Sequence, residues 1–332
     1  MRVWAILGAR QGDNNQVLAL AETLGVPFEI KQLDYNRWRH LGPRTLGATF
    51  RSLSPASRAT VSGDPPDLTI STGHRSVPMV QALRRRSPGR TRSIHVGYPR
   101  ISPANFDLVI ATPEYPMDDH PNLLRIPLAL TRRGHGGDER PDEWRAYPPP
   151  RRLLILGGPT LYWAIRWPEV RRALDKLLDN AACEGGSVMI AASPRTPDRL
   201  VSKVQAIVED SRVPVMVVPV GGLPRYAALL ARADMIAVTA DSVAMTSDAI
   251  AAGKPVALVP VAPTLAGRMA IALNDRLRPG QRLLPRDLRF FWRSLWEAGL
   301  AGTVERPVRA NPSDFSHLVA ARALTVLNRR SC

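Results

Sequence analysis

The chain has 332 residues, of which 45% are hydrophobic and 22% are charged, a composition that excludes a disordered protein and favours two domains. Its net charge of +16 comes almost entirely from arginine, so it reflects either the codon usage of a GC-rich genome or binding to anionic ligands and an acidic membrane surface; no nucleic-acid partner is expected. No run approaches the ~20 apolar residues of a membrane span, and the N-terminal residues do not resemble a signal peptide, so we expect a cytoplasmic location.

Short aliphatic runs alternate with helical patterns from the start of the chain, which predicts βαβ units and a parallel sheet. The expected strands lie at 2–7, 28–33, 68–71, 92–96 and 108–111, and the expected helices at 16–24 and 77–86. The segments 8–15 and 72–75 are the loops after the first and third of these strands. Residues 1–135 are therefore predicted to form a doubly wound lobe.

A stretch rich in glycine, proline and charge precedes Pro150 and predicts a linker at 136–150. Beyond it the alternation resumes. The expected strands lie at 152–156, 187–191, 214–218, 235–238 and 256–259, and the expected helices at 170–180, 199–210, 225–232 and 242–252. Residues 151–312 thus form a second lobe, and 313–332 hold a helix that we expect to pack across the lobes. The fold class is α/β, with two Rossmann-like lobes facing each other across a cleft.

Two loops of the second lobe carry candidate phosphate ligands, because ligands bind outside the carboxyl ends of parallel strands. Gly157 and Gly158 follow the strand at 152–156 and allow a phosphate to approach the backbone, although a glycine pair is also typical of a simple tight turn. Arg195, next to Thr196 and flanked by two prolines, offers a planar set of donors to a diphosphate. The alternative for Arg195 is a solvated surface side chain.

The segment 235–259 indicates strand, hydroxyl-rich loop, helix and strand, with Gly253 ending the helix. Asp241 or Ser242 caps the helix, whose N-terminus suits a pyrophosphate. Asp248 can accept hydrogen bonds from ribose hydroxyls. The nucleotide-binding residues expected in this helix are Ser242, Thr246, Ser247 and Asp248. The alternative is that Thr246, Ser247 and Asp248 form an ordinary solvated face.

Several motifs in their order along the chain resemble the elongated-mitochondria (mitochondrial fission ELM-like) family, of which the chain would be a bacterial member. They include GDNNQ at 12–16, TGHRS at 72–76, SPRTP at 193–197 and ADSVAMTSDAIAAGKP at 240–255. The resemblance implies a fold like that of two-lobed, glycosyltransferase-B enzymes. The last motif is also similar to the donor-binding element of lipid-acceptor glycosyltransferases. This chain departs from the expected pattern at two positions. The acidic residue, more usually glutamate, is Asp248 here, and an expected Arg-Arg pair is Pro194-Arg195.

What the resemblance implies is a metal-independent, inverting glycosyltransferase of cell-envelope glycan or glycolipid synthesis. Its donor substrate would be a nucleoside diphosphate sugar, with no further cofactor. The first lobe would present the acceptor, and Asp13 and His74 are the candidate general bases, although Asp13 can equally cap the first helix. A nucleotide-sugar epimerase of the same fold and a non-catalytic, membrane-associated fission-type adaptor are the alternatives.

A basic and aromatic segment of the first lobe is a candidate membrane contact. It holds Arg37, Trp38, Arg39, His40, Arg44, Phe50 and Arg51 among several leucines. Arginine attracts an anionic leaflet and tryptophan seats at its interface, so a lipid-linked acceptor and peripheral attachment to the inner membrane are candidate properties. The alternative is that Trp38, Leu46 and Phe50 belong to the core and the arginines cover them.

Overall fold

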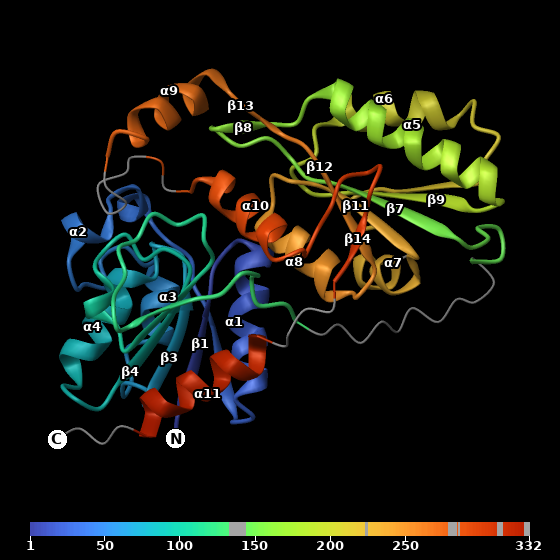
Figure 1. The fold of residues 1–332 in the computed structure, drawn as a ribbon. Helices are drawn as coiled ribbons and strands as arrows, with labels where there is room; N and C mark the ends of the chain where they lie inside the picture. Colours follow the sequence, from blue (N-terminus) through green and yellow to red (C-terminus); the bar gives the residue numbers. More distant parts are fainter. Residues whose placement is uncertain (133–143, 223–224, 278–283, 285, 311–314, 329–332) are drawn as a thin grey trace. The chain divides into compact units, whose positions relative to one another are not determined.

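The computed structural model describes residues 1–132, 144–222, 225–277, 284, 286–310 and 315–328. Contacts between residues divide the chain into one unit of Met1–Arg132 with Asp314–Cys332 and a second of Arg133–Ser313. Each unit is built around a six-stranded sheet, so the chain has the predicted α/β, two-lobed architecture (Figure 1). Residues 136–143 of the expected linker, 136–150, lie outside the described residues, and 144–150 lie within them.

The sheet of the first lobe has the order β2-β1-β3-β4-β5-β6, and its neighbouring strands are parallel. The strands are β1 (Val3–Leu7), β2 (Phe28–Gln32), β3 (Leu68–Thr72), β4 (Arg92–Val96), β5 (Leu108–Ala111) and β6 (Leu123–Arg125). The strand order reverses between β1 and β3. In open parallel sheets ligands bind outside the carboxyl ends of the strands at such a point.

Successive residues of these strands face two different cores, as the twofold period of a strand requires. Val3 and Ala5 pack with α1, whereas Trp4 and Ile6 pack with α4. The helices of this lobe are α1 (Gln11–Thr23), α2 (Pro43–Leu46), α3 (Pro55–Thr60), α4 (Val77–Arg86) and α11 (Phe315–Asn328), with 3-10 turns η1 (Arg37–His40) and η2 (Pro103–Asn105). The sheet is thus buried on both faces.

Helix α1 begins at Gln11, earlier than the sequence predicts. The reason is the buried side chain of Asn14, which accepts a hydrogen bond from the Gly8 N–H and donates one to the Gly8 carbonyl, both at 2.8 Å. These bonds close the loop after β1 within three residues. The GDNNQ motif therefore lies in the first turns of the helix, and the N-cap position is Arg10, so the interpretation of Asp13 as the cap is wrong.

Helix α11 completes the core of the first unit. Its residues Val319, Ala320, Ala323 and Val326 are buried in the same cluster as α1 and the strands, and it contacts α1 and β5. The sequence predicts a helix here that packs across the lobes, whereas these contacts place it with the N-terminal 132 residues. The apolar face of α11 supplies the part of this core that the first 132 residues leave open.

The sheet of the second lobe has the order β10-β9-β7-β11-β12-β14. Its strands are β7 (Arg151–Leu156), β9 (Ser187–Ala192), β10 (Val215–Val218), β11 (Met235–Thr239), β12 (Pro255–Val259) and the edge strand β14 (Val308–Arg309). They are parallel except for β14, which pairs antiparallel with β12. Here the order reverses between β7 and β11, so the loops after these two strands are the expected ligand region.

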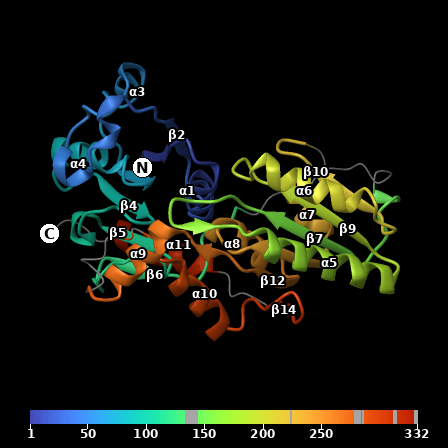
Figure 2. The ribbon, with the colours of Figure 1, turned by 90° about the horizontal axis from the view of Figure 1, so that it is seen from above.

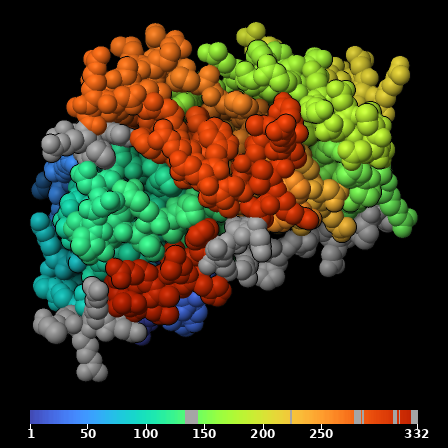
Figure 3. Space-filling model, in the orientation of Figure 1, coloured from blue at the N-terminus to red at the C-terminus, as the bar shows by residue number. Residues whose placement is uncertain are grey.

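Helices cover both faces of this sheet, α5 and α6 on one side and α7 and α8 on the other (Figures 1 and 2). The helices are α5 (Trp167–Glu184), α6 (Asp198–Val208), α7 (Tyr226–Arg232), α8 (Val243–Ala251), α9 (Leu265–Asn274) and α10 (Leu288–Glu297), and a two-stranded ribbon pairs β8 (Trp163–Ala164) with β13 (Ala262–Pro263). Helices α9 and α10 lie at the surface, where α9 leaves Leu265 and Met269 exposed (Figure 3).

Candidate functional site

The predicted phosphate-binding residues of the second lobe come together at the reversal of strand order. Gly157 and Gly158 follow β7, Arg195 follows β9, and Asp241 follows β11. The strands β9, β7 and β11 are neighbours, so their carboxyl ends bring these three loops side by side. The side chain that joins the loops is Asp241.

Asp241 is fully buried and receives hydrogen bonds from all three loops. Its carboxylate accepts from the Thr239 hydroxyl at 2.7 Å, from the Gly158 N–H at 3.1 Å and from Arg195 Nη2 at 3.0 Å. Arg195 also donates from Nη1 to the Gly158 carbonyl at 3.0 Å. A buried carboxylate is stable only when it is paired and hydrogen-bonded, and these contacts meet that requirement.

The two glycines allow this close packing. A Cβ on Gly157 would lie 2.1 Å from an oxygen of Asp241, and one on Gly158 would lie 2.1 Å from the carbonyl oxygen of Arg195. The Gly157 N–H is already bonded to the Thr239 hydroxyl at 2.7 Å. The absence of side chains therefore serves the Asp241 and Arg195 contacts, and both glycine N–H groups are engaged inside the lobe.

Arg195 is held with its guanidinium partly open to solvent. The Thr196 hydroxyl donates to the carbonyls of Leu156 and Gly157 at 2.8 Å and accepts from the Ser193 N–H at 2.8 Å, which fixes the loop. The Arg195 side chain is 45% exposed. Its two internal hydrogen bonds leave the rest of its five donors for a ligand. The solvated alternative for this arginine holds in part, because its side chain is exposed but also hydrogen-bonded to Asp241.

Helix α8 begins beside this assembly. Ser242 is its N-cap and accepts from the Met245 N–H at 3.4 Å, so of the two expected caps it is Ser242 that caps the helix, while Asp241 bonds to the neighbouring loops. Gly253 follows the C-cap with φ 69°, as predicted for the residue that ends the helix. The first N–H groups of a helix lack intrahelical partners, so those of Val243 and Ala244 are donors for an anion.

Asp248 lies further along α8, closely surrounded by protein but partly accessible to solvent. Burial raises its pKa from 3.8 to about 7. The Tyr226 hydroxyl is buried without a hydrogen-bond partner among the described residues, and burial and the charge of Asp248 raise its pKa. Thr246 and Ser247 are also buried, so the interpretation of this helix as a solvated face is wrong. In this structure Ser242 and Asp248 are the more accessible polar residues of the helix.

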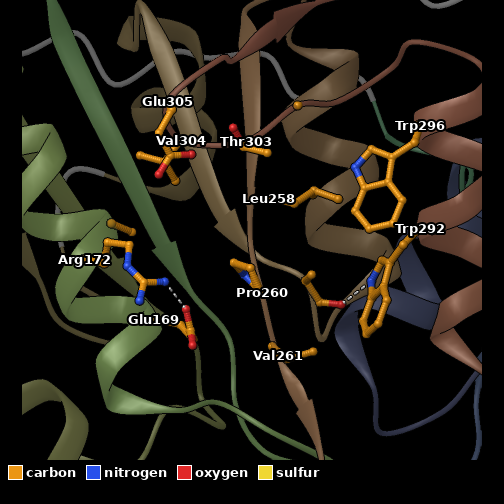
Figure 4. Close-up of a pocket in the computed structure, with 13 residues that line it drawn as sticks. Glu169, Arg172, Leu258, Pro260, Val261, Trp292, Trp296, Thr303, Val304 and Glu305 are labelled. Carbon is orange, nitrogen blue, oxygen red and sulfur yellow. Dashed lines mark hydrogen bonds and ion pairs between the residues drawn. The ribbon is translucent and has the colours of Figure 1, made fainter.

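No sequence pattern predicts that Trp292 contacts the loop after β11. Its indole N–H, on α10, donates to the Ala240 carbonyl at 2.9 Å and so holds the loop after β11 from a helix 52 residues away in the sequence. Trp292 and Trp296 form one wall of a cavity of about 270 Å³, opposite the Glu169–Arg172 ion pair (Figure 4). The cavity takes in Ala240 but none of the predicted nucleotide-binding residues.

The two candidate bases lie in the first lobe at its own reversal of strand order. Asp13 is half-buried in the first turn of α1, after β1. His74 follows β3, and burial and the charges of Arg100, Arg75 and Arg10 lower its pKa from 6.5 to about 4. The imidazole is therefore uncharged at neutral pH. Within the described part of the chain, no hydrogen bond joins Asp13 to His74.

The candidate membrane segment is partly exposed. Trp38 and Leu41 are 45% and 39% exposed, whereas Leu53 is fully buried and Phe50 packs against the core of α4. The basic residues around Trp38 are exposed. No helix within the described ranges has the length and apolarity to span a membrane, and no three metal-ligating side chains gather anywhere in them.

Comparisons with known proteins agree with this architecture. The family model described as mitochondrial fission ELM1 matches residues 11–293. A search of curated proteins gave no match. Among solved structures, a putative UDP-N-acetylglucosamine 2-epimerase from Listeria monocytogenes is 12% identical, with a TM-score of 0.55 over 99% of this chain and 98% of that one.

Two further solved structures have the same fold. The UDP-GlcNAc 2-epimerase from Methanocaldococcus jannaschii is 10% identical with a TM-score of 0.51, covering 98% of this chain and 99% of that one. The enzyme from Neisseria meningitidis, solved with UDP-GlcNAc bound, is 12% identical with a TM-score of 0.51, covering 98% and 100%. At these identities the similarity establishes the two-lobed Rossmann-like fold.

Proposed function

We propose that this chain, which belongs to the mitochondrial fission ELM1 family and has a two-lobed fold, is a nucleotide-sugar-dependent glycosyltransferase. The donor is held by the second lobe, and the observation that carries the proposal is the assembly of Arg195 on buried Asp241 beside the N-terminus of α8. This assembly presents fixed positive charge where a diphosphate leaving group develops negative charge.

The diphosphate is assigned to the free donors of Arg195, to the Ser242 hydroxyl and to the first N–H groups of α8. Gly157, Gly158 and Thr196 position these donors, since their own polar groups are bonded within the lobe. In the transfer step an acceptor hydroxyl oxygen forms a bond to the anomeric carbon. The bond from that carbon to the diphosphate breaks with its electron pair, the proton passes to a base, and the nucleoside diphosphate departs.

The ribose is assigned to Asp248. Two hydroxyls of a ribose can donate to its carboxylate, which favours the charged form and offsets the cost of burying it. Thr246 and Ser247 on α8 are proposed to support the nucleoside, together with Tyr226 at the start of α7, whose hydroxyl has no hydrogen-bond partner among the described residues and feels the charge of Asp248. If Asp248 binds the ribose in this way, UDP should bind more tightly than 2′-deoxy-UDP, and the difference should vanish in Asp248→Ala.

The acceptor and the general base are assigned to the first lobe, with Asp13 and His74 as the candidates. A base with a pKa of about 4 takes up a proton poorly at pH 7, so His74 needs a change in its surroundings to act efficiently. Variants Asp13→Asn and His74→Gln should separate the two. The base is the residue whose loss lowers kcat for sugar transfer by about 100-fold or more while donor binding is unchanged.

A thermal-shift screen against nucleoside diphosphates tests the proposal. A ligand present at about a hundred times its dissociation constant adds about 2.7 kcal/mol to the free energy of unfolding, so at least one diphosphate should raise the Tm measurably. Adenosine and uridine as nucleosides alone provide the control for the diphosphate. If no member of the panel moves the Tm, the non-catalytic adaptor becomes the better account.

A second candidate function is a nucleotide-sugar epimerase. It is favoured by the names of the solved structures that share the fold with TM-scores above 0.5. A 2-epimerase must remove and replace the proton at C2 of the sugar, so incubation with UDP-GlcNAc alone in D₂O would introduce deuterium there. A transferase leaves C2 unlabelled and consumes donor only when an acceptor is added.

The exposed part of the basic segment is proposed to meet an anionic membrane that carries a lipid-linked acceptor. Trp38 and Leu41 are exposed beside Arg37 and Arg39, and each arginine near an anionic leaflet contributes about 1 kcal/mol. Co-sedimentation with phosphatidylglycerol vesicles should be salt-sensitive and reduced in Arg37→Glu/Arg39→Glu. The pair Arg85→Glu/Arg90→Glu, in the last turn of α4 and in the turn after it, is the charge-matched control. Equal sedimentation of the two variants would remove this segment as the contact.

A further inference from the structure

The carboxyl end of the first-lobe sheet gathers arginines from three neighbouring strands. Arg10 follows β1, Arg75 follows β3 and Arg100 follows β4, and these strands are adjacent and parallel. The charge of each acts on His74, which lies between the loops. The position coincides with the reversal of strand order between β1 and β3, where open sheets of this kind bind ligands.

The loops that carry these arginines are fixed and open to a ligand. Asn14 and Gln32 hold Gly8 through hydrogen bonds of 2.8–2.9 Å, and the Ser76 hydroxyl donates to the carbonyls of Thr72 and Gly73 at 2.9 Å. A Cβ placed on Gly8 or on Gly73 would meet nothing within 4 Å. Space therefore remains above both loops, and the backbone around it is held in place.

Arg100 has a backbone conformation that side chains rarely adopt. It is the non-glycine residue with a positive φ, 61°, among those described. Such a conformation costs on the order of 1 kcal/mol and persists where the surrounding structure demands it. The strain is consistent with a guanidinium that is directed to a particular place.

Arg10, Arg75 and Arg100 are exposed residues within the described part of the chain. None of them forms an ion pair or a hydrogen bond there, whereas Arg84 and Arg92, elsewhere in the same lobe, pair with Asp107 at 3.3 and 3.1 Å. Asp13 is the nearest carboxylate in the sequence, and no ion pair joins it to them. With His74 uncharged, these three arginines are the charged groups that act on its ring.

We propose that Arg10, Arg75 and Arg100, arranged around His74, form an oxyanion site that binds a phosphoryl group of the acceptor. Arginine matches phosphate oxygens with paired donors, and three guanidiniums suit a phosphate dianion or a diphosphate. The assignment to the acceptor rests on the proposed transferase function, whereas the oxyanion site itself stands on the first lobe alone.

The bound anion has a consequence for His74. Its negative charge offsets those of the arginines, so the pKa of the imidazole rises from about 4 toward its ordinary value of 6.5. A ring with a pKa closer to neutrality is a better general base. The acceptor would thus activate the base that deprotonates it, and the ring would remain a poor base while the site is empty.

Calorimetry with inorganic pyrophosphate tests the site in the full-length protein. The titration is made in the presence of saturating UDP, which occupies the second-lobe site. Wild-type protein should bind pyrophosphate, and Arg75→Ala/Arg100→Ala should bind it at least tenfold more weakly. Arg85→Ala is the control, because Arg85 is an exposed, unpaired arginine in the last turn of α4, at the other edge of the sheet.

Equal binding by the double variant and wild type would overturn the proposal, as would an equal loss in Arg85→Ala, which would indicate binding to general positive charge. Displacement of pyrophosphate by UDP would overturn the assignment to the acceptor, because the arginines would then hold the donor. If UDP itself fails to bind, the proposed transferase fails, while the comparison of variants in pyrophosphate alone still judges the oxyanion site.

A nitrogen NMR titration of His74 gives an independent measure. The His74 resonances are identified by their loss in His74→Gln, and the charge of His74 acts on buried His95, while Arg75 and Asp34 act on Tyr35. Saturating pyrophosphate should raise the pKa of His74 in wild type but not in the double variant. An unchanged pKa in the saturated wild-type protein would place the anion elsewhere.

Discussion

At the scale of single residues, Asp241 is the group on which the second-lobe site depends. Its buried carboxylate accepts hydrogen bonds from the loops after three neighbouring strands and orients Arg195. Because Arg195 is 45% exposed, loss of one partner costs less than the about 3–5 kcal/mol of a fully buried ion pair. The contacts of Asp241 therefore contribute to the stability of the lobe, and they are formed without a ligand.

Gly158 should not tolerate a side chain. In Gly158→Ala the Cβ would lie 2.1 Å from the Arg195 carbonyl oxygen, so the loop after β9 must move. We expect a loss of about 1–3 kcal/mol in the free energy of unfolding, measured by denaturant titration, together with weaker UDP binding. Gly63→Ala is the control, because a Cβ there meets nothing within 4 Å. Equal stability of the two variants would show that the contact is not tight.

Asp248 makes stability and binding depend on pH. Its folded-state pKa of about 7 lies above the unfolded value near 3.8, so the folded state holds a proton that the unfolded state has lost between these values. The stability associated with this group is present below pH 3.8 and is lost as pH rises to 7. Asp248→Asn should remove that part of the decline, seen as a growing advantage in the free energy of unfolding from pH 4 to 7.

Ribose binding should reverse this preference. Hydrogen bonds donated to the carboxylate lower its pKa, so UDP should release a proton near pH 7, measured as a buffer-dependent binding enthalpy. Asp210→Asn, on an exposed residue beyond α6, is the control for both measurements. Identical pH profiles for wild type and Asp248→Asn would contradict the assigned environment.

The sequence predicts Arg195 and Ser242 as anion ligands because each follows a predicted strand in the residue pattern of an anion site, and their binding stays a prediction. It does not identify Trp292 or the contacts of Asp241. The indole of Trp292 reaches the loop after β11 from 52 residues away, and no local spacing signals such a contact. Asp241 has the sequence context of a helix cap, and only the packing of three loops makes it a shared acceptor.

At the scale of elements, α8 joins the site to the sheet. Its N-cap, Ser242, directly follows Asp241, to which Arg195 is bonded, and its buried side packs against β11 and β12. The free N–H groups at its start are therefore held in a fixed position. This is the arrangement in which a helix N-terminus stabilises an anion without reorganisation.

Ser242→Ala should separate the capping role from the binding role. Loss of the cap costs about 1 kcal/mol in the free energy of unfolding. The same substitution should weaken UDP binding, since the hydroxyl is proposed to contact the diphosphate. The matched control is Ser54→Ala, which removes the N-cap of α3 in the first lobe, where Ser54 accepts from Ser57 N–H at 3.2 Å. If both variants bind UDP equally, Ser242 is a cap only.

Most elements with a clear period are predicted from the sequence, but α10, whose buried Leu288, Phe291 and Leu295 follow the helix period, is not, and neither are elements set by tertiary contacts. The buried strands and helices α4, α5 and α8 have the expected positions, because their apolar residues repeat at the strand or helix period. The two-residue strands β8, β13 and β14 are too short to show a period. Helix α9 escapes prediction because its leucines and Met269 face outward.

At the scale of the whole molecule, both lobes have arginines in loops near the point at which the strand order reverses, although their strand orders differ. The reversal lies between β1 and β3 in the first lobe and between β7 and β11 in the second. Arg195 is paired to Asp241 at the second of these positions, and Arg10, Arg75 and Arg100 lie in the loops at the first.

The central claim is that the second lobe binds a nucleoside diphosphate through Arg195, and calorimetric titration of the full-length protein with UDP tests it most directly. Wild type should bind one UDP. Arg195→Ala should bind it at least about tenfold more weakly, because charge-assisted hydrogen bonds contribute about 1.5–3 kcal/mol. Arg212→Ala, at an exposed arginine between α6 and β10, should bind as wild type does. Absence of UDP binding by wild type, or equal binding by the Arg195 variant, would contradict the account.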